Sequence, residues 1–109
     1  MIKDSLNIIK VGGAIVESEE SLQGLLMSFS SLKGRKILVH GGGKIATEVA
    51  AKLGVETQMI DGRRITSAEM LKVVTMVYGG LVNKNLVARL QALGVNAIGL
   101  TGADLNLII

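Results

Sequence analysis

The sequence has no cysteine, no proline and no tryptophan, and only one phenylalanine, one tyrosine and one histidine among its 109 residues. Without cysteine there are no disulfides, no thiolate metal ligands and no cysteine nucleophile, which is typical of a reducing compartment. With so few aromatic rings, stacking on nucleic-acid bases is excluded as a main source of affinity. The core must therefore be built from aliphatic side chains.

Long apolar runs are absent as well. No stretch reaches the roughly 18 uninterrupted apolar residues that a membrane-spanning helix needs, and the first five residues, MIKDS, lack the apolar stretch of a secretion signal. The net charge of +3 comes from lysines and arginines spread along the chain, without a basic run that would mark a nucleic-acid surface. We therefore expect a soluble cytoplasmic protein with no membrane partner and no nucleic-acid partner.

The sequence is instead rich in aliphatic residues and in glycine. Hydrophobic residues make up 49% of the chain, and there are 14 glycines. Disordered linkers usually combine glycine with proline and polar residues, so these glycines indicate tight turns in a folded unit. A chain of this length is enough for one domain with its own core.

Short apolar stretches alternate with segments of helical periodicity. The apolar stretches predict strands at 6–11, 36–40 and 95–100, a short strand at 57–60 and the start of another at 105–109. Apolar residues three and four positions apart predict helices at 18–33, 44–53 and 66–93, the last with a capping box at Thr66–Glu69 and an interruption at Gly79–Gly80. This alternation predicts an α/β fold with a mainly parallel sheet sandwiched by helices.

The longest glycine run lies between an expected strand and an expected helix. The backbone of Gly41–Gly43 and the free helix N-terminus behind it suit an anion. A P-loop is excluded because Leu38 and Ile45 stand where that motif needs glycine and then serine or threonine. The segment Gly41–Ala46 does satisfy the dinucleotide fingerprint, with Asp61 as the ribose-binding acid. A tight turn that binds nothing is the other interpretation.

Lys10 stands near the end of the first apolar strand and is followed by Val11, Gly12 and Gly13. An ammonium group in such a place is costly to bury without an anionic partner. It either extends to solvent or binds phosphate oxygens that approach the backbone of the two glycines. Phosphoryl transfer needs positioning and neutralisation of charge more than a covalent group, and lysine with backbone donors provides both.

Two adjacent arginines, Arg63 and Arg64, precede the third expected helix. A guanidinium group can hold a carboxylate through two parallel hydrogen bonds, although many loop arginines are only solvated. Both interpretations are open from these residues alone.

Five blocks of the sequence resemble the N-acetylglutamate kinases, within the amino acid kinase family, in order and spacing. They are Ile8–Gly13 (IIKVGG), Val39–Gly43 (VHGGG), Asp61–Thr66 (DGRRIT), Val82–Leu86 (VNKNL) and Ile98–Asp104 (IGLTGAD). The first two blocks resemble several amino acid kinases, and the arginine and VNKNL blocks narrow the choice.

The resemblance implies ATP-dependent phosphorylation of the side-chain carboxylate of N-acetyl-L-glutamate, or a related N-acylglutamate, in arginine biosynthesis. It gives Lys10 the catalytic role of stabilising the transferring phosphoryl group, which Gly12–Gly13 would contact. Gly42 and Gly43 would hold the acylated substrate, and Arg64 would bind its carboxylate. His40 is expected to be structural, because a carboxylate that is already ionised needs no base.

The same resemblance implies ATP with Mg²⁺ as phosphoryl donor and no metal ligand in this part of the chain. Family members are more than twice as long, and their second half supplies most of the ATP site. We therefore expect residues 1–109 to be the amino-terminal part, for binding the acyl amino acid and for dimerisation, and to be inactive alone. The helix expected at 66–93 has apolar residues over more than one face and glycines in its middle, which indicates a homodimer.

Two other hypotheses stay open. The chain is a dinucleotide-binding domain if Gly41–Ala46 and Asp61 act together, or a non-catalytic module that binds an amino acid.

One departure from the family concerns Asp104, because Ala103 stands where the family often has lysine. The role of Asp104 is therefore open.

Overall fold

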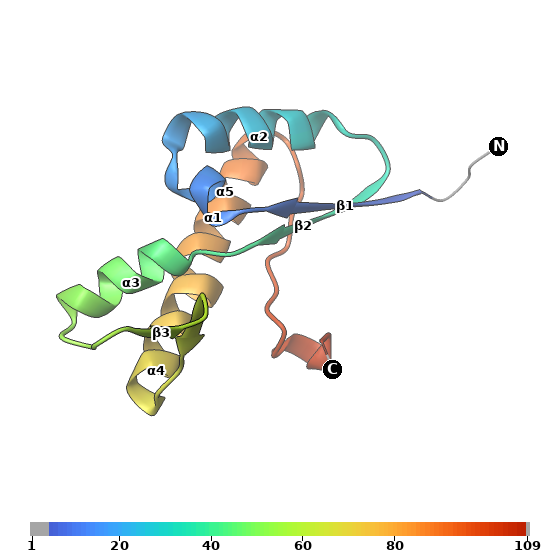
Figure 1. Cartoon of the computed structure of the whole chain (residues 1–109). Helices are drawn as coiled ribbons and strands as arrows, with labels where there is room; N and C mark the ends of the chain where they lie inside the picture. The colour runs from blue at the N-terminus through green and yellow to red at the C-terminus, as the bar shows by residue number, and fades with distance from the viewer. Residues whose placement is uncertain (1–4, 109) are drawn as a thin grey trace.

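The structure is a computed structural model that describes residues 5–108. Figure 1 shows its helices and strands. In chain order they are β1 (Leu6–Val11), α1 (Gly13–Glu17), α2 (Glu19–Ser31), β2 (Arg35–His40), α3 (Gly43–Lys52), β3 (Gln58–Ile60), β4 (Arg63–Ile65), α4 (Ala68–Met76), the π-helix η1 (Val77–Val82), α5 (Asn83–Ala92) and the 3₁₀ helix η2 (Asp104–Asn106).

The sheet that organises the chain is the parallel pair β1–β2. Its register runs from Leu6 opposite Arg35 to Val11 opposite His40. The predicted α/β class with a parallel sheet is confirmed. The crossover between the two strands consists of α1 and α2, as expected for parallel neighbours.

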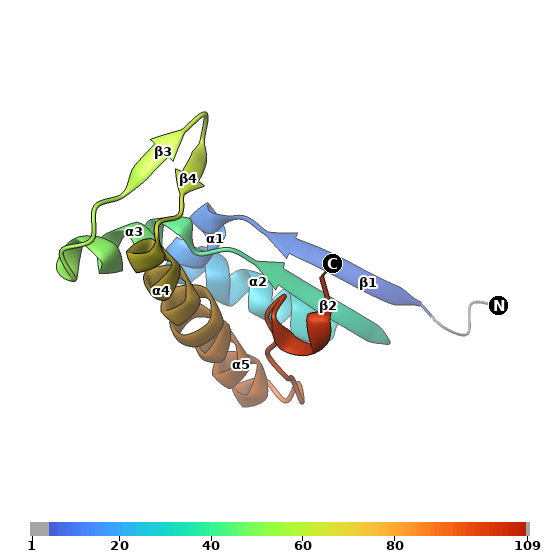
Figure 2. The ribbon, with the colours of Figure 1, turned by 90° about the horizontal axis from the view of Figure 1, so that it is seen from below.

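Helices cover one face of this sheet in the described part of the chain. Ile9, Val11 and Leu38 belong to the core beneath α2 and its neighbours. The alternate residues lie on the opposite face, where Ile8 is 64% exposed and Ile37 is 47% exposed. Figure 2 shows that face from below, with α2 behind the strands. The strands are apolar on both faces, as predicted, but residues 5–108 supply a helical layer on one face only.

Both ends of α2 are fixed by polar side chains. Ser18 caps its N-terminus by accepting a hydrogen bond from the backbone N–H of Ser21. At the other end, the ammonium of Lys36 on β2 donates to the carbonyls of Phe29, Ser30 and Leu32, at 2.8, 3.2 and 2.6 Å. A cation at the C-terminal carbonyls is favourable for a helix, and here it also ties α2 to the sheet.

The helix predicted at 66–93 is present, and its interruption falls at the expected glycines. Residues Val77–Val82 form a π-helix between α4 and α5. The N-cap is Ser67 rather than Thr66, since the Ser67 hydroxyl accepts the backbone N–H of Met70 at 3.1 Å. The predicted capping box is therefore wrong: with Ser67 as the N-cap the third helical position is Met70, and Glu69 lies in the first turn but out of register for the reciprocal bond.

Residues 95–100 do not form the predicted strand. The segment runs back from α5 without strand pairing, and side chains take several of its carbonyls. Gln91 donates to Ala97 O at 3.1 Å, and Lys84 donates to Gly99 O at 2.9 Å. The apolar pattern predicts a strand, but no neighbouring strand in residues 5–108 completes a ladder with this segment.

The short strand predicted at 57–60 is present as β3, and it pairs with β4, which the apolar pattern did not predict. The strand expected to start at 105 is wrong within the described residues. Asp104–Asn106 form the 3₁₀ turn η2, and Ile109 lies outside the described residues.

The core can be tested with two neighbouring residues of α2. Leu26 is fully buried, whereas Met27 is 53% exposed. We expect Leu26→Ala to lower the free energy of unfolding by about 3 kcal/mol, because it leaves a cavity in an aliphatic core. Met27→Ala should change it by less than about 0.5 kcal/mol. Urea denaturation followed by circular dichroism measures both values, and equal losses would contradict the placement of α2.

Candidate functional site

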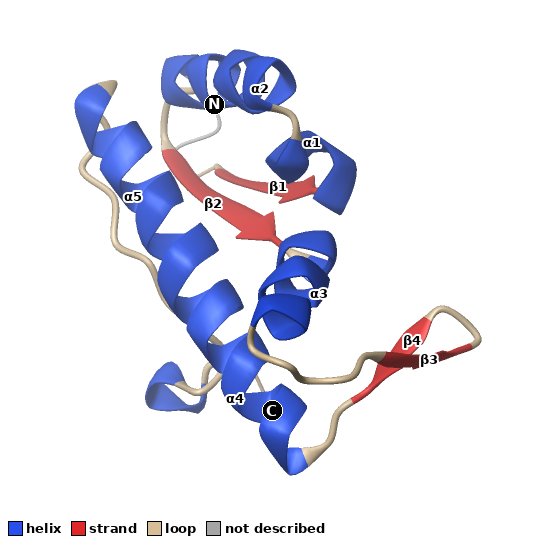
Figure 3. Cartoon of the chain, turned by 90° about the vertical axis from the view of Figure 1, so that its left-hand side faces the viewer, coloured by secondary structure: helices blue, strands red, loops and turns tan. Residues whose placement is uncertain are grey.

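The two glycine turns leave the sheet side by side. Because β1 and β2 are parallel and Val11 lies opposite His40, the turn at Gly12 and the turn at Gly41 emerge at the same edge. Helices α1 and α3 start directly behind these turns, as Figure 3 shows. Ligands of parallel sheets bind at this edge, beyond the carboxyl ends of the strands.

The middle glycine of the second turn is packed tightly against the π-helix. Gly42 has a φ of +154°, and an added Cβ would lie 3.1 Å from both Tyr78 and Val82. At Gly41 an added Cβ would meet no atom within 4 Å. The turn is thus closed on the side of η1 and open on the other. A side chain at position 42 would force it away from the helix.

Arg64 reaches the same turn from the hairpin. Its Nη2 donates to Gly43 O at 2.8 Å and to Thr47 Oγ1 at 3.0 Å, while its Nη1 makes a longer contact of 3.8 Å with Met70 Sδ. The Thr47 hydroxyl also donates to Gly43 O at 3.0 Å. The structure therefore brings Gly42, Gly43 and Arg64 together, three of the residues predicted to bind substrate.

Lys10 lies on β1 opposite Val39, one residue before the strand ends at Val11. It alternates with Ile8 and therefore points to the uncovered face of the sheet, where it is exposed. No described acidic side chain forms an ion pair with it. Lys10 is close to both glycine turns through the strand register, and not through a side-chain contact.

The first glycine turn has open space around it. An added Cβ at Gly12 would meet no atom within 4 Å, and one at Gly13 would lie 3.6 Å from Glu17 Oε1. The helix behind these glycines, α1, has five residues and carries no acidic residue in its first turn. The space on the Cβ side of Gly12 is therefore open in the described chain.

Asp61 has a local structural role. It occupies the turn between β3 and β4 together with Gly62, with φ values of +50° and +76°. Two residues with positive φ between paired strands are the mark of a type I′ hairpin, which favours Asp-Gly. The hairpin is separate from the β1–β2 sheet. The dinucleotide hypothesis places this acid on the parallel sheet, so the geometry gives it no support.

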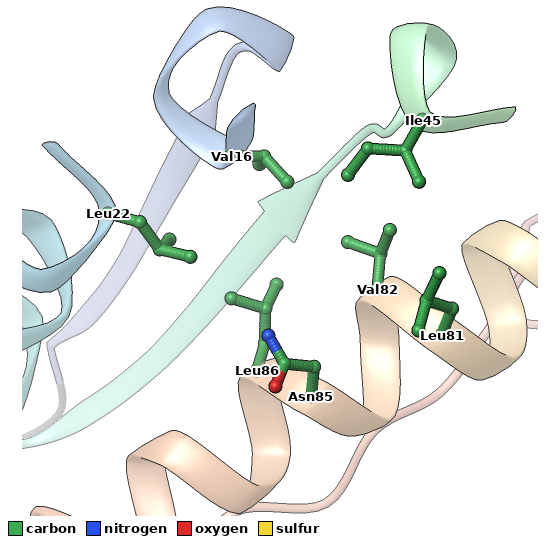
Figure 4. Close-up of a pocket in the computed structure, with 7 residues that line it drawn as sticks. All are labelled: Val16, Leu22, Ile45, Leu81, Val82, Asn85 and Leu86. Atoms are coloured by element: carbon green, nitrogen blue, oxygen red, sulfur yellow. The ribbon is translucent and has the colours of Figure 1, made fainter. Parts of the chain in front are cut away.

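An apolar pocket of about 230 Å³ lies apart from these residues. Figure 4 shows it between α1, α2, α3, η1 and α5, with Asn85 as the polar side chain among its labelled residues. None of the predicted site residues lines it. The candidate site is therefore the open edge at the two glycine turns and not the apolar pocket.

Comparison with known proteins gives the family. A family model described as "Amino acid kinase family" matches residues 5–108. The chain belongs to the amino acid kinase family. Within residues 5–108, no helix is both long and apolar enough to cross a membrane.

Several relatives of this amino acid kinase chain carry the name acetylglutamate kinase. That of Phocaeicola vulgatus is 68% identical over 107 residues, which are 98% of this chain and 42% of the relative. That of Methanopyrus kandleri is 42% identical over 104 residues, 95% of this chain and 39% of the relative. The crystal structure of smu.665 from Streptococcus mutans UA159 has a TM-score of 0.68 and 27% identity, covering 89% of this chain and 40% of that one. The chain thus spans about two fifths of the length of these relatives.

Sequence reasoning missed the side chains that hold the second glycine turn in this amino acid kinase. Thr47 lies one helical turn after Gly43, a spacing at which a threonine hydroxyl often bonds the carbonyl four residues earlier. His40 and Asn83 are joined by a hydrogen bond across 43 positions of sequence. No sequence pattern indicates that contact, although both residues lie in blocks that resemble the family.

The structure gives Asp104 a role in a turn. Its Oδ2 accepts hydrogen bonds from the backbone N–H of Thr101 at 2.6 Å and from the Thr101 hydroxyl at 3.0 Å. These bonds, the backbone one first, hold the pKa of the Asp104 carboxyl below its ordinary value of 3.8, with a smaller contribution from the positive charge of Lys84. The carboxylate therefore closes the turn after residues 95–100.

The sign of this shift gives a pH prediction. Because the folded-state pKa is depressed, the turn contributes stability above the unfolded pKa and loses it as the pH falls through the folded value. We expect the amide proton shift of Thr101 to titrate with a midpoint below 3.8. Thr101→Val keeps the backbone donor and removes the hydroxyl, so it should raise the midpoint only part of the way. A midpoint at or above the ordinary value in the unmodified chain contradicts the turn.

Proposed function

We propose that this chain is the amino-terminal, substrate-binding part of an acetylglutamate kinase. The whole enzyme transfers the γ-phosphoryl group of ATP to the side-chain carboxylate of N-acetyl-L-glutamate, or a related N-acylglutamate, in arginine biosynthesis. The contact between Arg64 and Gly43 O carries this proposal, because it fixes a carboxylate-binding cation at a glycine turn of the strand edge. The names of relatives up to 68% identical support it.

In the proposed reaction a carboxylate oxygen of the substrate attacks the γ-phosphorus, an acyl phosphate forms, and ADP leaves. The carboxylate is ionised near neutral pH, so no protein base is required. Lys10 neutralises charge on the phosphoryl oxygens in transit, and the backbone of Gly12 and Gly13 lets those oxygens approach. Lysine is suited to this task because it is a compact point charge on a flexible stem.

Arg64 holds the α-carboxylate of the acylated substrate. Both hydrogens of its Nη2 are engaged by Gly43 O and Thr47 Oγ1, whereas Nη1 has only the weak sulfur contact. A substrate carboxylate therefore finds Nη1 available without any movement of the loop. A bidentate grip uses Nη2 as well, and it displaces either the Thr47 hydroxyl or the Gly43 carbonyl.

The phosphoryl donor is ATP with Mg²⁺, and the rest of the enzyme supplies most of its site. The described residues hold no group of three or more histidine, aspartate or glutamate side chains placed to ligate a metal ion. These residues do not fit a metal site, and no step through Mg²⁺ is assigned to them. We propose that the 109-residue chain is inactive alone, because the rest of the enzyme supplies most of the ATP site. The enzyme acts in the cytoplasm and has no nucleic-acid or membrane partner.

Two substitutions separate the proposed roles. The test enzyme is a chimeric kinase in which this chain replaces the matching segment of the Phocaeicola vulgatus relative. Lys10→Ala should lower kcat by about 100-fold or more and change the KM for acetylglutamate by less than about 3-fold, because its charge acts on the transition state. Arg64→Ala should instead raise that KM by roughly 10- to 100-fold, the loss of one charge-assisted hydrogen bond, and leave the KM for ATP unchanged.

Arg63→Ala is the matched control for Arg64→Ala, because it removes the neighbouring exposed arginine of β4 and should leave both constants unchanged. A folded Lys10→Ala enzyme with an undiminished kcat contradicts the catalytic assignment. If Arg64→Ala raises the KM for ATP rather than the KM for acetylglutamate, Arg64 acts on the phosphate groups and not on the substrate carboxylate. An unmodified chimera that folds but phosphorylates no acylglutamate contradicts the proposed function itself.

We also propose that the kinase is a homodimer built through the helix α4–η1–α5. Leu71, Met76 and Leu81 are each more than half exposed on α4 and η1. Gly79 packs on Thr101 of its own chain, but an added Cβ at Gly80 would meet no atom within 4 Å, which leaves room for close approach of a partner backbone. Light scattering on the chimera at micromolar concentration should give twice the mass of one chain, and a monomer contradicts the dimer.

A further inference from the structure

His40 is placed to hold the second glycine turn. It is the last residue of β2, half-buried, directly before Gly41. Its Nδ1 lies 2.9 Å from the carbonyl oxygen of Gly41. A carbonyl oxygen can only accept a hydrogen bond, so the proton of the ring must sit on Nδ1.

The other ring nitrogen is held by Asn83, the first residue of α5. Asn83 Nδ2 lies 3.1 Å from His40 Nε2, and the Asn83 side chain is buried at 6% exposure. The orientation of its amide follows from two further partners. Its Oδ1 accepts from the Lys84 ammonium at 3.1 Å, and its Nδ2 also faces Leu100 O at 3.3 Å. Nδ2 is therefore the donor and Nε2 the acceptor, which only the neutral ring with its proton on Nδ1 satisfies.

With this bond, both carbonyls that flank Gly42 are held by side chains. Gly41 O is held by His40, and Gly43 O is held by Arg64 and Thr47. The hydrogen bond to Gly41 O is supported from α5, through Asn83 and His40. The hydrogen bond from Arg64 to Gly43 O comes from the β3–β4 hairpin. A loop whose carbonyls are fixed in this way also has its N–H groups fixed, and those at the start of α3 have no partner within the helix.

We propose that His40, held by Asn83, is a positioning residue for the Gly41–Gly43 turn. The imidazole fixes the Gly41 carbonyl and so directs the N–H groups of the turn toward the acylated substrate. Asn83 couples this position to residues 99–100, since Lys84 binds Gly99 O and an added Cβ at Gly99 would overlap Asn83. The inference rests on the proposed function for the identity of the substrate, but the bonding pattern of the ring does not depend on it.

The first experiment determines which ring nitrogen of His40 carries the proton. His40 is the only histidine of the chain, so its ¹⁵N signals are unambiguous. Long-range ¹H–¹⁵N spectra of the 109-residue chain near neutral pH should show a protonated Nδ1 and an unprotonated Nε2. Asn83→Asp has nearly the same shape but cannot donate to Nε2, so this pattern should be lost. A proton on Nε2 in the unmodified chain, or an unchanged spectrum in Asn83→Asp, overturns the inference.

The second experiment measures the effect on the reaction in the chimeric kinase. His40→Asn can keep a donor near the position of Nδ1, His40→Gln can keep a polar group near Nε2, and His40→Leu keeps neither. We expect His40→Asn to retain kcat/KM for acetylglutamate within about 5-fold, and the other two to lose roughly 10- to 100-fold through a displaced loop, with the KM for ATP nearly unchanged.

Equal losses in all three variants indicate a merely structural residue and overturn the positioning role, as does a fully active His40→Leu. Because His40→Asn and His40→Gln are both polar, they decide the matter even where His40→Leu does not fold. If the unmodified chimera is inactive, the proposed function is contradicted, and so is the claim that the turn directs its N–H groups toward an acylglutamate. This outcome is seen before any His40 variant is made. The spectra then still decide whether the His40–Asn83 bond holds the turn.

Discussion

The parallel pairing of β1 with β2 is the constraint on which the site depends. Its register places Val11 opposite His40, and because the strands are parallel both glycine turns leave the sheet at the same edge. A shift by one residue would turn Lys10 into the helical core and Val11 out of it, because side chains alternate between the faces of a strand. The buried Val11 and the half-buried Ile9 hold that register, so packing of the core also determines which way the lysine points.

The second glycine turn is where the fold and the site meet. Gly42 lies against Tyr78 and Val82 of a π-helix, and its two neighbours are bonded by His40 on one side and by Arg64 on the other. π-Helical turns are rare and often occur at functional sites. Here the wider turn coincides with the glycine pair of the long helix. The loop is thus shaped by three elements that are distant in sequence.

Sequence reasoning recovered the features that local chemistry determines. The apolar faces of α2 and α3, the strands before each glycine turn and the break at Gly79–Gly80 all followed from periodicity and glycine placement. The hairpin was missed although Asp61–Gly62 is a strong signal for it, because the dinucleotide hypothesis gave Asp61 the role of a ribose-binding acid. The strand expected at 95–100 failed for another reason: an apolar pattern predicts an extended backbone, but pairing depends on a neighbour.

For the site, the residue types in the glycine blocks indicated phosphate chemistry, whereas the contacts of His40, Asn83 and Thr47 needed coordinates. A hydrogen bond between positions 40 and 83 leaves no periodic trace in sequence. The proximity of Arg64 to Gly43 was expected only from resemblance to a family, and the structure adds the third member, Thr47, that fixes the guanidinium. Long-range polar contacts are therefore the part of such a site that sequence patterns do not predict.

The two cations of the candidate site are held in opposite ways, and the difference fits the proposed chemistry. Arg64 is fixed by Gly43 O and Thr47, so its geometry is set by the fold before any ligand arrives. Lys10 has no described ion-pair partner and is exposed, so its ammonium can follow a moving group. In the proposed reaction a rigid clamp on the α-carboxylate helps to orient the side-chain carboxylate that attacks, because preorganisation lowers the entropy lost in reaching the reactive geometry. A phosphoryl group that changes its bonding partner is better stabilised by a mobile point charge, and this is the property that the proposed role of Lys10 uses.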